Sequence, residues 1–322
     1  MICLNSDLPK PLSEIFTSAC HECLRELCLE TREFAALLGD IKSDGSRIPG
    51  AIEQRAQLIH LPDHAQFLRF ITSQAAAVAD SRGQTSDAVL LYHLCEDYDN
   101  VISVLNRALA DAVAVELGDA PLSLQPLRPR SNNASPQTDA SSSLSLTQTT
   151  NSPLELAQNI THLYNRSPTY YRTISVSNRE TATILITLLQ ARALLESSHP
   201  DYLAALERIN SLAILPLDTK GEVSVVRQMA SKFSNLPSLV TRCAGLVILW
   251  CVRAIGAERD RLAREGSWEI ATPRGDVGNE VSKLRDQLGV MARDLMVFAG
   301  LVKYKLPGRV YESLTRVGGD TY

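Results

Sequence analysis

Three cysteines and a histidine lie within nine positions of one another near the start of the chain, in the stretch CHECLRELC. Thiolate and imidazole groups are ligands that zinc prefers, so Cys20, His21, Cys23 and Cys28 are the first candidates for chemistry. A structural zinc site needs four convergent ligands, typically supplied as two close pairs. A second pair is missing, because the other cysteines stand apart from one another: Cys3, Cys95, Cys243 and Cys251.

Helical geometry offers another interpretation of this stretch. Each residue of an α-helix advances about 100° around the axis. Cys20 and Cys23 then share a stripe with the large apolar residues, while His21 and Cys28 fall at its edge; the stripe also holds Phe16, Leu27, Phe34 and Leu38. Free cysteine packs as a small hydrophobic side chain. We therefore predict a packed helix here, with no metal and no cofactor.

Other catalytic patterns are missing from the sequence. It contains no phosphate-binding Gly-x-x-x-x-Gly-Lys-Ser/Thr loop, no Gly-x-Ser-x-Gly elbow and no His-Glu-x-x-His motif. DIKSDG (40–45) begins like a calcium loop, but Lys42 takes a ligand position and Ala51 replaces the required bidentate glutamate. His60 and His64 are separated by Pro62, which prevents both from lying on one helical turn. We predict that the protein is not an enzyme.

Charge and composition exclude further classes of protein. The 322 residues are 45% hydrophobic and 21% charged, with a net charge of −4, so no basic footprint for direct nucleic-acid binding exists. The N-terminus lacks the pattern of a signal peptide, which predicts reduced cysteines in the cytosol or nucleus. The most apolar run, 243–252, is shorter than the roughly 20 residues that cross a bilayer. We predict a buried helix there and no transmembrane span.

Helical periodicity dominates the elements that must position any site. A first helix is predicted over 12–39, with Ser13 as a candidate N-cap and Gly39 as its end, and a second over 63–83, with Asp63 as N-cap. Segments 85–98 and 99–118 have almost no loop between them and predict an α-hairpin. Tyr92 and Tyr98 should pack their rings there, around a core of Leu90, Leu91, Leu94, Val101, Val104, Leu105 and Leu109.

The second half of the chain is predicted to be helical as well. One run, RTISVS (172–177), has strand character, and a single run makes no sheet. The predicted helices cover 153–165, 178–197, 200–213, 221–234, 238–265, 279–300 and 307–317.

Between the two helical parts lies a segment of different composition, 119–152, rich in Ser, Thr, Pro, Asn and Gln. It cannot bury enough apolar area to offset its ordering entropy, so we predict a long disordered loop. The first helical part is then 1–118 and the second 153–322. Successive helix pairs of roughly 30–45 residues are typical of solenoids. The predicted fold is all-α, an elongated solenoid of stacked antiparallel helices, with a compact bundle as the alternative.

The last helices carry the candidate partner-binding residues. Val297, Val302, Tyr304 and Tyr311 cluster around the bend at 307–308. Apolar and aromatic residues at the end of a helical array either pack under a neighbouring helix or remain open as a groove for an amphipathic segment. Core packing is the favoured interpretation of these four, and partner binding is the alternative that we carry forward as the candidate site. The stripe that should face the neighbouring helix comprises Leu288, Met291, Leu295, Phe298 and Leu301.

Two Ser-Pro pairs suggest regulation of the polar segment. Ser135 and Ser152 each precede a proline, the pattern that proline-directed kinases read. A phosphate adds about −1.5 to −2 charges. At Ser152 this charge would lie near the N-terminus of the next helix and could favour it.

Several long stretches together resemble one family. LLYHLCEDYDNVISVLNRAL (90–109) and the opening ICLNSDLP are similar to the fungal nucleoporin-interacting-component family, the inner-ring scaffold nucleoporin of the ninety-three to ninety-six kilodalton class. The same likeness is carried by LETREFAALLGDI, GAIEQR, AAAVAD and LRDQLGVMARDLMVFAGLVKYKLPGRVYESL.

The resemblance implies a function and a place in the cell. Family members are non-enzymatic α-solenoids of the nuclear pore complex, at the nuclear envelope, and hold other nucleoporins through short linear motifs. One such partner is a small membrane-associated nucleoporin. The chain corresponds to the carboxy-terminal part of the family's solenoid and has no counterpart of its N-terminal recruitment region. Its first helix pair would then lack a covering neighbour, so we expect fraying before residue 60.

Two other functions remain open from the residues alone. The chain could be an adaptor or trafficking solenoid unrelated to the pore that binds peptides. It could also be a metal-dependent helical enzyme built around Cys20, His21, Cys23 and Cys28.

Overall fold

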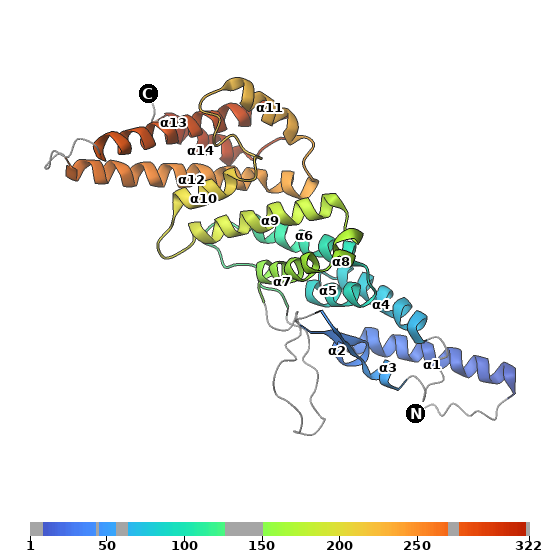
Figure 1. The fold of residues 1–322 in the computed structure, drawn as a ribbon. Coiled ribbons are helices and arrows are strands. Elements are labelled where there is room, and N and C mark those ends of the chain that lie inside the picture. Colours follow the sequence, from blue (N-terminus) through green and yellow to red (C-terminus); the bar gives the residue numbers. More distant parts are fainter. Residues whose placement is uncertain (1–8, 43–44, 56–63, 126–150, 270–276, 320–322) are drawn as a thin grey trace. The chain divides into compact units, whose positions relative to one another are not determined.

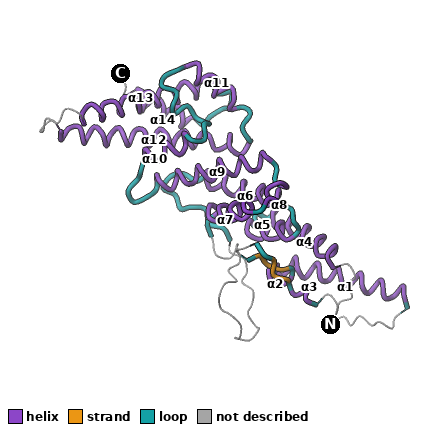
Figure 2. The backbone as a smooth tube through the Cα atoms, in the orientation of Figure 1, coloured by secondary structure: helices purple, strands orange, loops and turns teal. Residues whose placement is uncertain are grey.

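A computed structural model describes residues 9–42, 45–55, 64–125, 151–269 and 277–319. These residues are mostly helical, with one short pair of strands (Figures 1 and 2), which confirms the all-α class. The helices form two compact units, which we call unit 1 (1–108 and 122–178) and unit 2 (109–121 and 179–322). The predicted division at 119–152 stays a prediction, since 126–150 lie outside the described residues.

Unit 1 begins with a helix that ends earlier than the sequence predicts. Helix α1 runs over Lys10–Thr31, starting before Ser13, so Ser13 is not its N-cap. Arg32 then adopts a left-handed conformation, φ 57°, and its backbone N–H donates to the Cys28 carbonyl. The side chain of Arg32 also reaches Asp87 at 2.9 Å. This turn separates α1 from the short helix α2 (Phe34–Leu37), so the single helix predicted over 12–39 is wrong.

A β-hairpin follows α2, where the sequence predicts no strand. Strand β1 (Gly39–Ile41) pairs antiparallel with β2 (Arg47–Pro49), and α3 (Ala51–Gln54) comes next (Figure 2). Gly39 has φ +121°, which suits glycine. A Cβ on Gly50 would lie 2.3 Å from the Leu37 carbonyl oxygen, so the chain crosses itself too closely here for any side chain.

Unit 1 continues with α4 (His64–Ser81), α5 (Thr85–Leu94), α6 (Tyr98–Ala114, whose residues 109–114 belong to unit 2), α7 (Pro153–Arg166) and α8 (Pro168–Thr173). An aromatic cluster lies among α5, α6, α7 and α8. Asp63, the predicted N-cap of α4, lies outside the described residues. The buried imidazole of His93 approaches the Tyr164 hydroxyl at 2.8 Å, and Tyr98 and Tyr170 pack around the pair.

The α5–α6 hairpin confirms its predicted core. Of the seven predicted core residues, Leu94 is partly buried and the other six are at most 4% exposed: Leu90, Leu91, Val101, Val104, Leu105 and Leu109. Tyr98 packs its ring as predicted, 4.6 Å from that of Tyr170. The strand character of 172–177 is wrong, because these residues end α8 and begin α9 (Val176–Leu195).

Unit 2 packs around one long apolar helix. Its elements are α9, α10 (Tyr202–Asn210), α11 (Val223–Phe233), α12 (Ser238–Glu269), α13 (Val277–Leu301) and α14 (Gly308–Gly319). Helix α12 contacts α10, α13 and α14, and α13 also contacts α11 (Figure 1). Phe298 of α13 is fully buried, with its ring edge-to-face against that of Phe233 at 5.7 Å.

Helix α12 is the one helix in the described residues whose length and composition would suit a membrane span. Its apolar side chains are instead buried by neighbours within unit 2; Cys243, Val247, Trp250, Cys251 and Ile255 are at most 2% exposed. Gly245 lets α14 approach, because a Cβ there would lie 2.9 Å from Cδ of Pro307. This packing supports the predicted core helix at 243–252.

Candidate partner-binding surface

The candidate surface lies where α13 ends and α14 begins. Val302 closes the last turn of α13 with a backbone hydrogen bond to Phe298, 3.0 Å. The connecting segment then buries Leu306, and the Val310 N–H donates to the Pro307 carbonyl, 2.9 Å. Buried side chains on both sides of the connection therefore hold a short, mostly exposed stretch in place.

Three of the four predicted partner-binding residues are accessible. Val297 is 37% exposed, and Tyr304 and Tyr311 are each 41% exposed. Val302 is only 9% exposed, so core packing describes this residue and it does not belong to an exposed binding surface. It follows Phe298 by four residues, and this spacing places it on the core side of α13.

Leu301, which the sequence assigns to the core, is exposed in place of Val302. Leu301 is 41% exposed, although the sequence predicts it in the stripe that faces the neighbouring helix. It lies four residues after Val297 and shares the outer face with it. The spacing of four between two apolar residues was the signal in the sequence. We call Val297, Leu301, Tyr304 and Tyr311 the α13–α14 surface.

The α13–α14 surface is anchored and has basic neighbours. The Tyr311 hydroxyl donates to the Ala299 carbonyl in the last turn of α13, 3.4 Å. Lys303 and Lys305 are both exposed in the connecting segment. Half-exposed apolar and aromatic side chains beside lysines suit a partner segment that is apolar on one side and acidic on the other.

The cysteine and histidine side chains near the N-terminus do not converge. Cys28 is fully buried and burial raises its pKa to about 11, while Cys23 is exposed. His21 packs its ring against that of Phe67 of α4, 4.6 Å between centroids. No group of three His, Cys, Asp or Glu side chains in the described part of the chain is placed to hold a metal ion.

The predicted core stripe of α1 is partly wrong. Phe16 and Leu27 are 43% and 45% exposed, and Cys23 is exposed as well. Cys28, predicted at the edge of the stripe, is fully buried. The break at Arg32 explains the difference, because Phe34 and Leu38 no longer continue α1 and cannot define its inner face.

Of the two predicted phosphorylation sites, the structure describes one. Ser152 occupies the N-cap position of α7 with extended backbone, φ −95° and ψ 126°, and its side chain makes no capping hydrogen bond. Pro153 follows at the first helical position. Ser135 lies outside the described residues.

Comparison with known proteins identifies the family. The protein-family model described as Nup93/Nic96 matches residues 1–313, nearly the whole chain. This chain belongs to the Nup93/Nic96 family. Membership confirms the resemblance seen in the sequence and places the chain in a family of nucleoporins.

Relatives of this Nup93/Nic96 chain support the assignment over its full length. It is 38% identical to Nucleoporin NIC96 of Chaetomium thermophilum over 325 residues, which cover 99% of this chain and 28% of that protein. It is 32% identical to Nucleoporin NIC96 of Saccharomyces cerevisiae over 298 residues, covering 92% of this chain and 32% of that protein. The chain thus spans about a third of the length of these relatives.

A solved structure shares the fold. The crystal structure of Chaetomium thermophilum Nic96 SOL superposes with a TM-score of 0.83 at 37% sequence identity. The match covers 94% of this chain and 41% of that one. The helical arrangement of this Nup93/Nic96 chain is therefore one already seen in its family.

Proposed function

We propose that the chain is a helical scaffold in the inner ring of the nuclear pore complex, at the nuclear envelope, and holds other nucleoporins by their short linear segments. The observation that carries the proposal is the Nup93/Nic96 family match over residues 1–313. A buried helical core that exposes apolar side chains at one place suits such a role, because the core holds the docking side chains in position.

The docking site in this proposal is the α13–α14 surface, and its occupant is an amphipathic segment of a small membrane-associated nucleoporin. Val297 and Leu301 lie one turn apart, as side chains that receive the apolar side of a helix or strand do. Tyr304 and Tyr311 supply aromatic groups, which are enriched among residues that dominate binding energy. Lys303 and Lys305 would face acidic residues that flank the segment.

The apolar and aromatic side chains of the α13–α14 surface are expected to contribute most of the binding free energy. Truncating a well-packed apolar or aromatic side chain at the centre of an interface costs about 2 kcal/mol or more. Exposed lysines contribute less, and their contribution falls as salt is raised. The proposal therefore predicts binding that is sensitive to apolar truncation and only moderately sensitive to salt.

Pull-down with the small membrane-associated nucleoporin tests the proposal. The variant Leu301→Ala with Tyr304→Ala should retain a small fraction of wild-type capture. A matched control truncates two exposed apolar residues elsewhere, Phe70→Ala with Val223→Ala, and should capture as the wild type does. Equal capture by all three proteins would exclude the α13–α14 surface, and no capture by the wild type would contradict the proposed partner.

A further inference from the structure

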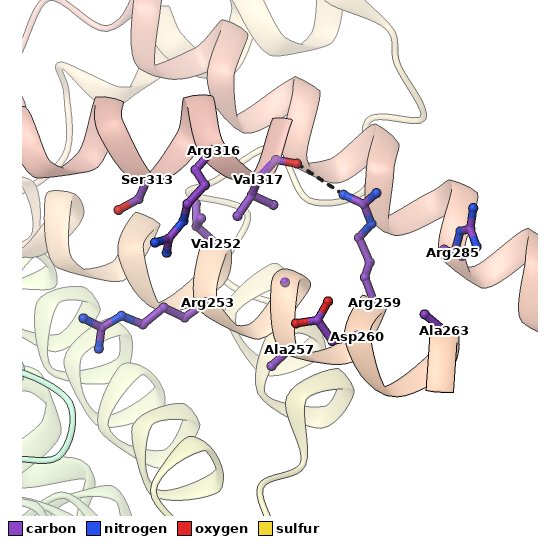
Figure 3. Close-up of a pocket in the computed structure, with 11 residues that line it drawn as sticks. Val252, Arg253, Ala257, Arg259, Asp260, Ala263, Arg285, Ser313, Arg316 and Val317 are labelled. Atoms are coloured by element: carbon purple, nitrogen blue, oxygen red, sulfur yellow. Dashed lines mark hydrogen bonds between the residues drawn. The ribbon is translucent and has the colours of Figure 1, made fainter. Parts of the chain in front are cut away.

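A hollow in unit 2 is basic, although the chain as a whole carries a net charge of −4. It is a cavity of about 530 Å³ between α12, α13 and α14 (Figure 3). Four arginines line it, Arg253 and Arg259 from α12, Arg285 from α13 and Arg316 from α14. The one acidic lining residue is Asp260. We call this hollow the arginine pocket.

The four arginines keep their charge available to a ligand. None of them forms an ion pair with a carboxylate in the described part of the chain, whereas four other arginines of unit 2 do: Arg192, Arg242, Arg261 and Arg309. Arg259 donates to the Val317 carbonyl at 3.2 Å, which fixes its side chain at the end of α14. Guanidinium groups repel one another when they line the same hollow and have no carboxylate partners. A bound anion offsets this repulsion.

The positions of the arginines indicate the length of the ligand. Figure 3 shows Arg253 and Arg316 toward one end of the pocket and Arg285 toward the other. Along α12 the lining runs from Val252 to Ala263, a distance of eleven residue steps, or about 16 Å at 1.5 Å per step. A single phosphate group is too small to contact both ends. A peptide segment of about five extended residues spans this length.

The floor of the arginine pocket suits a polypeptide. Between the charged ends it presents small or apolar residues, among them Gly256, Ala257 and Val317. A Cβ on Gly256 would just contact Val317, 3.7 Å away, so Val317 covers Gly256 and closes the floor at this point. Small residues let a second backbone approach closely, while the surrounding guanidinium groups pair with carboxylates.

From these features we propose that the arginine pocket binds an acidic segment of a partner protein. The pocket is separate from the α13–α14 surface, because Ser313 and Val317 lie on the side of α14 away from Tyr311, about 200° and 240° around the helix. The two sites can therefore be occupied by different segments. This inference does not depend on what binds at the α13–α14 surface.

Fluorescence anisotropy with labelled decaglutamate and the full chain tests the proposal. Decaglutamate should bind, and binding should weaken as salt is raised. The double variant Arg253→Gln with Arg316→Gln should bind about ten-fold more weakly or worse, since two charge-assisted pairs are lost. The control Arg227→Gln with Arg293→Gln removes the same charge from exposed positions outside the pocket and should bind within about two-fold of wild type.

Further measurements distinguish an acidic peptide from other anionic ligands. Absence of decaglutamate binding, or equal weakening in both double variants, would overturn it. So would binding at these arginines of inositol hexakisphosphate alone, or of phosphatidylserine-containing vesicles alone. Thermal unfolding checks that the variants are folded. If the double variant Arg253→Gln with Arg316→Gln does not fold, the single variant Arg285→Gln, at an exposed position, must by itself weaken binding measurably.

Discussion

Arg192, in the last turn of α9, and Glu196, the residue that follows α9, form a two-bonded ion pair over the end of α6. Arg192 Nε donates to Glu196 Oε2 at 3.1 Å, and Nη2 donates to Oε1 at 2.8 Å. The same guanidinium donates to the carbonyls of Ala112, Val115 and Glu116 at 2.6–2.9 Å. Arg192 is 4% exposed, so it closes the C-terminus of α6 with a buried cation.

Loss of this cation should destabilise unit 2 severely. Arg192→Leu removes the guanidinium donor from three carbonyls and from the Glu196 carboxylate, which keeps only the Gly118 N–H, and removing one partner of a buried pair costs about 3–5 kcal/mol. Urea unfolding followed by the fluorescence of Trp250, whose ring lies 5.9 Å from the guanidinium carbon, measures the change. Arg242→Leu is the control, because its ion pair with Asp111 is exposed and worth about 0–1 kcal/mol. Equal effects of the two substitutions would contradict this account.

The stability of unit 1 should fall as the pH is lowered. Burial lowers the pKa of His93 from 6.5 to about 4, so the folded protein keeps the imidazole neutral where the unfolded chain binds a proton. The stabilisation is complete above pH 6.5 and is lost as the pH falls toward 4. The difference between these two pKa values corresponds to about 3 kcal/mol of folding stability. The neighbouring hydroxyls of Tyr98 and Tyr164 do not titrate in this range, since burial raises their pKa values.

Substitution isolates the contribution of His93. The free energy of unfolding of His93→Gln should change less between pH 7 and pH 4.5 than that of the wild type. His199→Gln, at an exposed position, should keep the wild-type dependence. The assignment fails if His93→Gln and the wild type lose stability in parallel.

Two glycines of α12 should respond to alanine with opposite signs. Gly245→Ala brings a methyl group to 2.9 Å from the Pro307 ring, which cannot move aside, and overpacking of this kind costs about 1–3 kcal/mol. Gly256→Ala makes an ordinary contact with Val317 at 3.7 Å and should gain up to about 1 kcal/mol from the higher helix propensity of alanine. Thermal unfolding of the two variants decides: a stabilised Gly245→Ala would count against the close packing of Pro307, and a destabilised Gly256→Ala would contradict the ordinary contact with Val317.

Phosphorylation of Ser152 should stabilise α7. A phosphate at the N-cap position places negative charge at the positive end of the helix, an effect of about 0.3–1 kcal/mol. Mass spectrometry of the chain after incubation in mitotic extract should find Ser152 and Ser135 modified. Hydrogen exchange of 153–160 should then slow, while Ser152→Ala removes the change. Unmodified serines would end this hypothesis.

Periodicity predicted most helices because each buries one face, a local property of the sequence. It missed the break at Arg32, which depends on a partner far along the chain, Asp87. The β-hairpin was missed for a similar reason, since three-residue strands are too short to show alternation.

The candidate surfaces show the same limit. Apolar side chains near a bend indicated the α13–α14 surface, but which of Leu301 and Val302 is covered depends on how α13 packs. The arginine pocket gave no signal at all. Its four arginines lie on three helices, spread over more than sixty positions of sequence, and only packing brings them to one hollow.

Hydrogen exchange with and without the segment of the small membrane-associated nucleoporin tests the central claim most directly. Binding to the α13–α14 surface should slow exchange in the last turns of α13 and in the connecting segment up to α14, about residues 295–311. Helices α4 and α5 in unit 1 should exchange at unchanged rates. Protection confined to unit 1, or no protection at saturating concentrations of the segment, would contradict the account.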